Sequence, residues 1–233
     1  MVERLVFAIL CHWRSGSSVL TKLLHACGMH LGNEATGWDD AWMVGPCEHN
    51  VFNSAGNGLY NFNDDSGLPA VIKTLLAYRT EAQRNDWDAY GVKFTHALQD
   101  KCFARMHPLF VKFWPDAHYV ISVRHPAGIV ASLKGTEITT DKIVESWMSA
   151  VPATKELAKA GATIVAYPDM LTVPKARKVV SKLGLTWTAA ASKLMEDSAG
   201  KIKGSVLSSL TMAMFDRNYP EAGKVFKELV KLS

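Results

Sequence analysis

The sequence predicts one α/β domain of three layers, with helices on both faces of a central parallel sheet. The chain has 233 residues and a hydrophobic content of 48%, which is enough to bury one substantial core. Short apolar runs typical of buried strands alternate with helical patterns, as expected for a parallel sheet. The first of these runs leads through a short loop directly into a helix. We therefore expect residues 1–233 to fold as a single domain.

The first strand, loop and helix lie near the start of the chain. Residues 5–10 (LVFAIL) form a continuous apolar run, too short to cross a membrane, that predicts a buried strand. From Ser17 onward apolar residues recur at steps of three and four, which predicts a helix that Gly28 ends. Between them, Gly16 lets the backbone approach an anion, and the helix start offers unpaired N–H groups. This unit is therefore expected to bind an anion.

The loop itself (CHWRSGSS, starting at Cys11) matches most of a phosphate-binding P-loop but lacks its lysine. A nucleotide-hydrolysing P-loop reads G-x-x-x-x-G-K-[ST]. Gly16 and Ser18 fit this pattern, whereas Cys11 replaces the first glycine and Ser17 replaces the lysine. Arg14 adds a forked, permanently charged donor suited to phosphate or sulfate oxygens. The loop therefore predicts an anion site that differs from a site for MgATP.

The rest of the chain continues the alternation of strands and helices. Residues 32–67 are rich in Gly, Asn, Asp and Trp, and we expect irregular chain or short helical turns there, lying over the scaffold. Periodicity and turn residues predict helices over 69–84, 99–114, 141–160 and 174–183, a helix entered through Pro126, and strands over 90–94, 117–123 and 162–167.

One edge of the predicted sheet collects three candidate ligand-binding residues. In sheets of this kind ligands bind beyond the carboxyl ends of the strands, where Arg14, Arg124 and Tyr167 all fall. A P-loop hydrolase needs an acidic residue at such a strand end to hold Mg²⁺. Arg124 stands there instead, so a second anion-binding group takes the place of a metal ligand.

These residues resemble the motifs of the sulfotransferases that use 3′-phosphoadenosine 5′-phosphosulfate (PAPS). In that family a basic residue followed by Ser-Gly-Thr/Ser binds the 5′-phosphosulfate, which matches Arg14-Ser15-Gly16-Ser17-Ser18. An Arg at a strand end and a Ser eight residues on bind the 3′-phosphate, which matches Arg124 and Ser132. The Tyr of a Tyr-x-Asp-Met/Leu element approaches the adenine, which matches Tyr167.

The resemblance covers residues 5 to about 185 and implies a P-loop NTPase-like, bacterial-type sulfotransferase. PAPS would be the donor, 3′,5′-adenosine bisphosphate (PAP) the product, and no metal would take part. Sulfuryl transfer spreads charge over peripheral and leaving oxygens, so fixed positive groups supply most of the catalysis. Arg14 and the N–H groups of Ser15 to Ser18 are expected to hold the 5′-phosphate, and Arg124 with Ser132 to grip the 3′-phosphate.

Two looser matches supply candidates for the chemistry at the acceptor. Bacterial relatives carry Gly-Tyr-Phe-Glu-[His/Asp] where this chain has GPCEH, which contains Glu48 and His49. They carry Gly-x-Lys-Asp-Pro-Arg where this chain has GVKFTH, which keeps Lys93 and loses the Asp and the Arg. Glu48 is the first candidate for the base that deprotonates the acceptor, and Lys93 for assistance at the leaving group or acceptor.

Several rivals for the base remain open at this point. His49 is the next candidate, because an imidazole is well matched to proton transfer near neutral pH. His96, which could replace part of the broken element, and Asp40 follow. His12, beside the loop, could contact a phosphate or sulfate instead.

Two other functions share parts of this pattern. A P-loop nucleotide or small-molecule kinase would have the same strand, loop and helix, although Ser17 and Arg124 stand where it needs a lysine and a carboxylate. A non-catalytic nucleotide- or sulfate-binding relative is suggested by the departures from the family pattern at Cys11 and at Thr95-His96.

The composition of the chain indicates which kinds of partner and which cellular compartment to expect. The formal net charge of +4 is mild, and no basic tract points to nucleic acid. The four cysteines form no C-x-x-C pair, which favours a reducing compartment over a zinc or disulfide framework. Without a membrane span or signal, we expect a cytoplasmic enzyme acting on a small-molecule donor and a hydroxyl-bearing acceptor. Carbohydrate, peptide tyrosine, lipid and small metabolite all remain open as acceptors.

Overall fold

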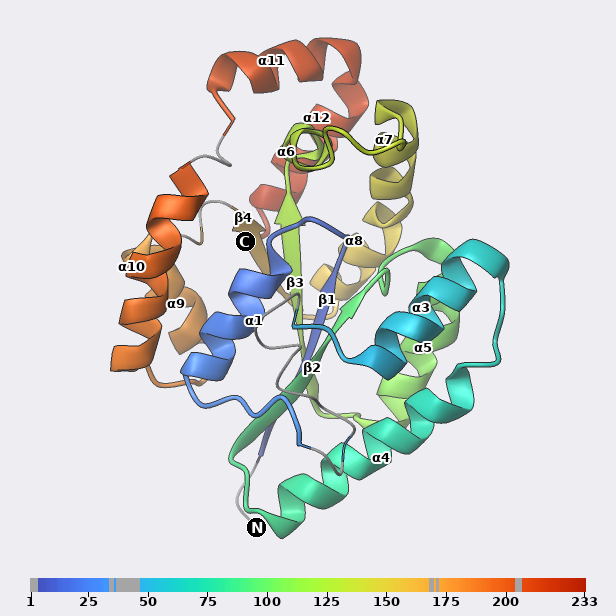
Figure 1. The fold of residues 1–233 in the computed structure, drawn as a ribbon, viewed down its shortest axis with the longest axis vertical. Coiled ribbons are helices and arrows are strands. Elements are labelled where there is room, and N and C mark those ends of the chain that lie inside the picture. The colour runs from blue at the N-terminus through green and yellow to red at the C-terminus, as the bar shows by residue number, and fades with distance from the viewer. Residues whose placement is uncertain (1–3, 34–35, 37–46, 168–169, 171, 204–206) are drawn as a thin grey trace.

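The fold is built on a four-stranded parallel sheet, as a computed structural model shows. The structure describes residues 4–33, 36, 47–167, 170, 172–203 and 207–233. The strands lie in the order β2-β1-β3-β4, with bounds β1 Leu5–Cys11, β2 Ala89–Thr95, β3 Ala117–Arg124 and β4 Thr163–Tyr167. All four coincide closely with the predicted strands, so the parallel α/β class is confirmed (Figure 1).

The register of the sheet aligns the carboxyl ends of its strands. Cys11, the last residue of β1, lies opposite Thr95 of β2 and Ser122 of β3. Arg124 at the end of β3 lies opposite Tyr167 at the end of β4. The loops that follow these strands therefore emerge at one edge, as expected for the ligand-binding edge of a parallel sheet.

One face of the sheet is covered by α1 (Ser17–Ala26), α9 (Val173–Lys182) and α10 (Ala189–Lys203) (Figure 1). Phe7 and Ile9 of β1 point to this face, because alternate residues of a strand face the same side. They pack with Leu20, Leu23 and Leu24, the apolar stripe of α1. The helix predicted from Ser17 is therefore confirmed as core on its inner side.

The opposite face carries the larger core. Ala8 and Leu10 of β1 point to it, and its helices are α3 (Asn50–Phe62), α4 (Leu68–Arg84), α5 (Asp100–Phe113), α7 (Thr140–Ser149), α8 (Val151–Lys159) and α12 (Pro220–Val230). The short α6 (Pro126–Ser132) follows β3 directly, and α11 (Ser209–Asn218) lies at the top of Figure 1 with no buried residue. In the described part of the chain, no helix is long and apolar enough to cross a membrane.

The structure differs from the predicted elements in two places. Within the segment expected to be irregular lies α3, a helix of 13 residues. Its sequence has poor helix propensity, but burial of Phe52 and Leu59 against the sheet overrides that preference. The helices predicted over 141–160 are confirmed as two, which meet at Ala150. Helices α10 to α12 lie beyond the predicted elements altogether.

Candidate functional site

A pocket of about 220 Å³ opens at the carboxyl ends of the strands. The loop after β1, the start of α1, the segment before α3 and the ends of β2 and β3 all contribute to it. Its lining consists of Trp13, Arg14, Gly16, Ser17, Ser18, Glu48, Lys93, Thr95 and Arg124. Most of the residues predicted from the sequence thus share one space, which three cationic side chains and a single carboxylate line.

The loop after β1 depends on glycine at its end. Gly16 has a φ of 89° and is the N-cap of α1, and no side chain caps the helix there. The positive end of the helix dipole therefore faces the pocket. A Cβ on Gly16 would lie 2.2 Å from Cδ2 of Tyr167, so only glycine lets this ring pack on the loop. Arg14 also has a positive φ, of 60°.

Arg14 and Arg124 occupy the loop side of the pocket. The Arg14 side chain is exposed, and no carboxylate among the described residues pairs with it. Arg124 is 8% exposed; its Nη1 donates to the carbonyl oxygen of Arg14 over 3.2 Å. Its guanidinium lies 4.8 Å from the centre of the Tyr167 ring. A Cβ on Gly128 would lie 2.6 Å from Nε of Arg124, so this glycine makes room for the side chain.

Burial destabilises the charged form of the Arg124 side chain. Loss of hydration lowers the pKa of Arg124, Tyr167 opposes that shift, and Arg14 adds to it through charge repulsion. Two guanidinium groups held this close favour an anionic ligand between or beside them, because the ligand relieves their repulsion.

Lys93 connects the start of α1 to the carboxylate of Glu48. Its Nζ donates to Oγ of Ser18 over 3.0 Å and to Oε1 of Glu48 over 3.0 Å. Thr95 donates to the same Oε1 over 2.6 Å. The Lys93 side chain is 2% exposed and that of Glu48 is 16% exposed, so the ion pair is largely desolvated. The second oxygen of Glu48, Oε2, makes no hydrogen bond within the described ranges, and Glu48 lines the pocket.

His96 lies beside this pair with one ring nitrogen in use. Nδ1 donates to Oε1 of Gln99 over 2.7 Å, and the ring stacks on Tyr60 with centroids 5.0 Å apart. Nε2 then carries the lone pair and bonds to no residue that the structure describes. Burial lowers the pKa of His96, although the bond to Gln99 and the charge of Glu48 act against that shift. His96 is therefore neutral near pH 7 and remains a rival base.

His49 has a structural place instead. Its Nδ1 accepts from the N–H of Val51 over 3.3 Å and so caps α3, and its Nε2 donates to the carbonyl of Thr36 over 2.9 Å. The side chain is buried, burial lowers its pKa, and it does not line the pocket. With both ring nitrogens bonded, the imidazole has no lone pair left to accept a proton.

Three predicted donor-binding residues, Ser15, Ser132 and Tyr167, lie outside the pocket lining. The hydroxyl of Ser15 is buried and has no hydrogen-bond partner among the residues that the structure describes, and Ser15 lines a small interior cavity with Ser122 and Arg124. The N–H of Ser15 donates to the carbonyl of His12 over 3.3 Å, within the loop. Ser132 donates to the carbonyl of Ile129 over 2.7 Å. Asp40, a candidate base, lies outside the described residues.

His12 serves the loop conformation rather than an anion. Its Nδ1 donates to the carbonyl of Trp13 over 2.9 Å, and its Nε2 accepts from the hydroxyl of Ser146, 3.1 Å away. Ser146 of α7 also bonds Nε2 of Gln99 at 2.7 Å and Nε1 of Trp13 at 3.4 Å. Sequence reasoning missed Ser146 and Gln99, because they reach the loop only through the packing of α5 and α7. Thr95 could have been predicted as a site residue, because it lies on the same face of its strand as Lys93, two residues before it.

Acid should destabilise the protein through His12. Burial lowers the pKa of this imidazole from 6.5 to about 3, because it is desolvated and its bond to Trp13 only partly compensates. Between these pH values the unfolded state binds a proton that the folded state does not, so the free energy of unfolding falls as pH falls, by up to about 1.4 kcal/mol per pH unit. Urea unfolding at several pH values measures this slope. His12→Asn should flatten it, because the amide can replace the bond to Trp13 without titrating; an equally steep slope would contradict the assignment.

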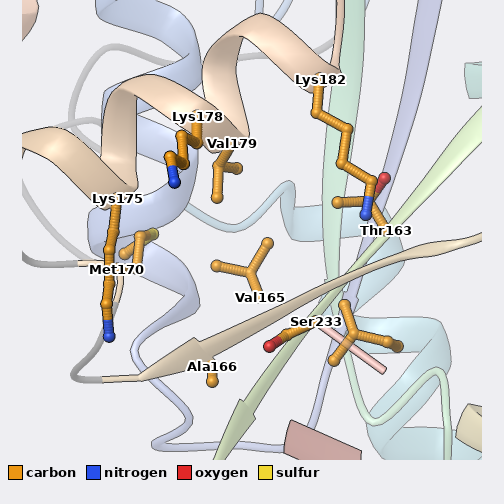
Figure 2. Close-up of a pocket in the computed structure, with 10 residues that line it drawn as sticks. Thr163, Val165, Ala166, Met170, Lys175, Lys178, Val179, Lys182 and Ser233 are labelled. Atoms are coloured by element: carbon orange, nitrogen blue, oxygen red, sulfur yellow. The ribbon is translucent and has the colours of Figure 1, made fainter. Parts of the chain in front are cut away.

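A second pocket, of about 360 Å³, lies at the open edge of the sheet and shares no residue with the first. Figure 2 shows Lys175, Lys178 and Lys182 of α9 beside it, around apolar side chains that include Val165 of β4. None of these lysines lines the first pocket. The proposed chemistry therefore concerns the first pocket alone.

Comparison with known proteins identifies the fold. No protein-family model matches the chain, and no curated protein sequence matches it. Among solved structures it is similar to sulfotransferase STF1 from Mycobacterium tuberculosis H37Rv, with a TM-score of 0.51 and 15% identity over 93% of this chain and 76% of that chain. It is also similar to the sulfotransferase domain of the Synechococcus PCC 7002 olefin synthase, with a TM-score of 0.47 and 14% identity over 82% of this chain and 77% of that one. The likeness to STF1 shows that this chain has a sulfotransferase-type α/β fold around its parallel sheet.

Proposed function

We propose that the protein is a PAPS-dependent sulfotransferase that transfers a sulfuryl group to an acceptor hydroxyl or amine. The observation that carries this proposal is the pocket itself, which Arg14, Lys93 and Arg124 line together with a single carboxylate, Glu48, beside the start of α1. A donor with a phosphosulfate and a separate phosphate presents negative charge at two points. Cations from three different strand ends suit such a ligand better than one loop would.

The donor would be held at both of its anionic ends. Arg14 and the backbone at Ser17 and Ser18 would bind the 5′-phosphosulfate at the start of α1. Arg124 would bind the 3′-phosphate, and Tyr167, which packs on Gly16 and on Arg124, would lie near the adenine. Ser132 would have to give up its bond to a helix carbonyl to reach a phosphate. Ser15 would act through the shape of the loop.

The transfer requires one base and one group that neutralises the leaving oxygen. The acceptor oxygen forms a bond to sulfur while the bond between sulfur and the bridging phosphate oxygen breaks, and PAP leaves. The acceptor proton passes to Oε2 of Glu48, whose other oxygen is fixed by Lys93 and Thr95. Lys93 and Arg14 stabilise the charge that develops on the bridging oxygen. His96 is the second candidate for the base, because its Nε2 lone pair is fixed by the bond from Nδ1 to Gln99.

Calorimetry with PAP tests the donor class. We expect PAP to bind without Mg²⁺, because the pocket supplies cationic side chains in place of a metal, and ATP with Mg²⁺ not to bind. Binding of MgATP without binding of PAP would identify a kinase-like nucleotide site instead. If PAP binds but radiolabelled PAPS transfers sulfate to no acceptor, water included, the protein is a non-catalytic binding relative.

The acceptor panel for that assay should span four chemical classes: a carbohydrate, a tyrosine peptide, a hydroxylated lipid and a small phenol. We propose no nucleic-acid partner, since the charge of +4 is spread along the chain. We propose the cytoplasm as its location, where cysteines stay reduced; all four cysteines are buried, and none forms a disulfide within the described part of the chain.

A further inference from the structure

The residue after Arg124 is tied to a part of the chain that sequence reasoning did not connect with the site. His125 is the N-cap of α6, and its Nδ1 accepts from the N–H of Ala127 over 3.2 Å. An acceptor at Nδ1 places the ring proton on Nε2, which donates to Oδ1 of Asp216 over 3.0 Å. Asp216 lies in the last turns of α11, 91 residues further along the chain.

The contact is enclosed by the hairpin of α11 and α12. The rings of Phe215 and Phe226 meet the His125 ring edge-on, at centroid distances of 5.7 Å and 4.9 Å. Oδ2 of Asp216 accepts from Lys227 of α12 over 2.9 Å. A Cβ on Gly223 would lie 2.4 Å from Cγ of Asp216, so a glycine in α12 leaves space for this carboxylate.

The junction between β3 and α6, where His125 lies, also positions the guanidinium of Arg124. His125 joins the end of β3 to the first turn of α6, and Gly128 in that turn lies directly under Arg124. Loss of the acceptor at Asp216 would leave the buried N–H of His125 without its partner and free the ring to turn, so the cap on α6 would be lost with it. The first turn of α6 would then no longer hold Arg124 in place.

We infer that Asp216 is a positioning residue for the donor: acting through His125, it sets the affinity for the 3′-phosphate and hence the preference for a 3′-phosphorylated nucleotide. This inference rests on the proposed function, because it takes Arg124 as the 3′-phosphate ligand. It assigns the C-terminal hairpin a role in donor selection, which is distinct from the chemistry at Glu48 and Lys93.

Calorimetric titration of PAP and of 5′-AMP, which lacks the 3′-phosphate, tests the inference. Asp216→Ala should weaken PAP binding about tenfold, the order of one lost hydrogen bond to a charged group, and leave 5′-AMP binding unchanged. A purely structural role would weaken both nucleotides together. Asp216→Asn keeps one acceptor oxygen and should restore most of the PAP affinity; it also replaces the alanine variant if that variant does not fold.

The matched control is Glu228→Gln. Glu228 also ties α12 to the body of the protein, by an ion pair of 2.9 Å with Lys155 of α8, but it contacts neither His125 nor Arg124. It should leave both affinities unchanged. If the wild type prefers PAP and Asp216→Ala keeps that preference, the inference is wrong and the proposed function stands. If the wild type binds PAP and 5′-AMP equally, the assignment of Arg124 to a 3′-phosphate site is wrong, and so is the inference that depends on it.

Discussion

Arg124→Ala should weaken PAP binding by about 30- to 100-fold, the order expected for a lost hydrogen bond between charged groups. The guanidinium is held by the carbonyl of Arg14, the ring of Tyr167 and the first turn of α6, so little of the binding energy is spent on ordering it. Binding of 5′-AMP should change little, because the 5′ end of the donor meets Arg14 and the start of α1. Titration calorimetry of both nucleotides gives the two affinities.

Two further variants make this result specific. Arg124→Lys keeps the charge but loses the planar fork, and we expect an intermediate affinity. Arg177→Ala is the matched control, because Arg177 also lies over an aromatic ring, that of Trp187 at 5.1 Å, but on α9 and away from the pocket. Unchanged PAP affinity in Arg124→Ala would place the 3′-phosphate elsewhere.

Glu48→Gln should lower turnover by about 100-fold or more, the usual contribution of a positioned general base. An amide cannot accept the acceptor proton, although it keeps the size of the side chain. Donor affinity should stay nearly the same, because the groups proposed to hold the donor are cationic. The measurement is initial-rate transfer from radiolabelled PAPS to whichever panel acceptor the wild type sulfates, together with PAP titration.

The comparison with His96→Gln decides between the two candidate bases. If Glu48→Gln keeps normal turnover and His96→Gln loses it, the base is His96. Glu81→Gln is the control for a partly buried carboxylate, since Glu81 on α4 is also bonded to a cation, Arg84 at 2.9 Å, but lies far from the strand ends. It should leave turnover unchanged.

The missing lysine of the loop has a counterpart in space. A P-loop carries its lysine just before the final Ser or Thr of the motif, and this chain has Ser17 there. In the structure Nζ of Lys93 on β2 lies 3.0 Å from Oγ of Ser18, so a lysine does reach the start of α1 from the neighbouring strand. The same ammonium contacts Glu48. The lysine therefore contacts the candidate base as well as the start of α1.

The strands and most helices were predictable because their signals are local. The apolar runs of β1 and β3 and the turn residues Gly16 and Pro126 are each read within a few residues, and the structure has the elements they predict. The helix α3 was not predictable in this way. Its Gly- and Asn-rich sequence favours irregular chain, and it becomes helical because its apolar side packs on the sheet and His49 caps its start.

The sequence by itself determined the fold class, the loop between β1 and α1 and the placement of Arg14, Arg124 and Tyr167 at strand ends, because each rests on a short pattern of apolar spacing, glycine or proline. The tertiary structure alone decided which distant side chains meet. Lys93 meets Ser18 across 75 residues and Glu48 across 45, and His125 meets Asp216 across 91. Such contacts depend on strand register and helix packing. These bring together distant segments, and the local sequence of one segment does not indicate which other segment it will contact.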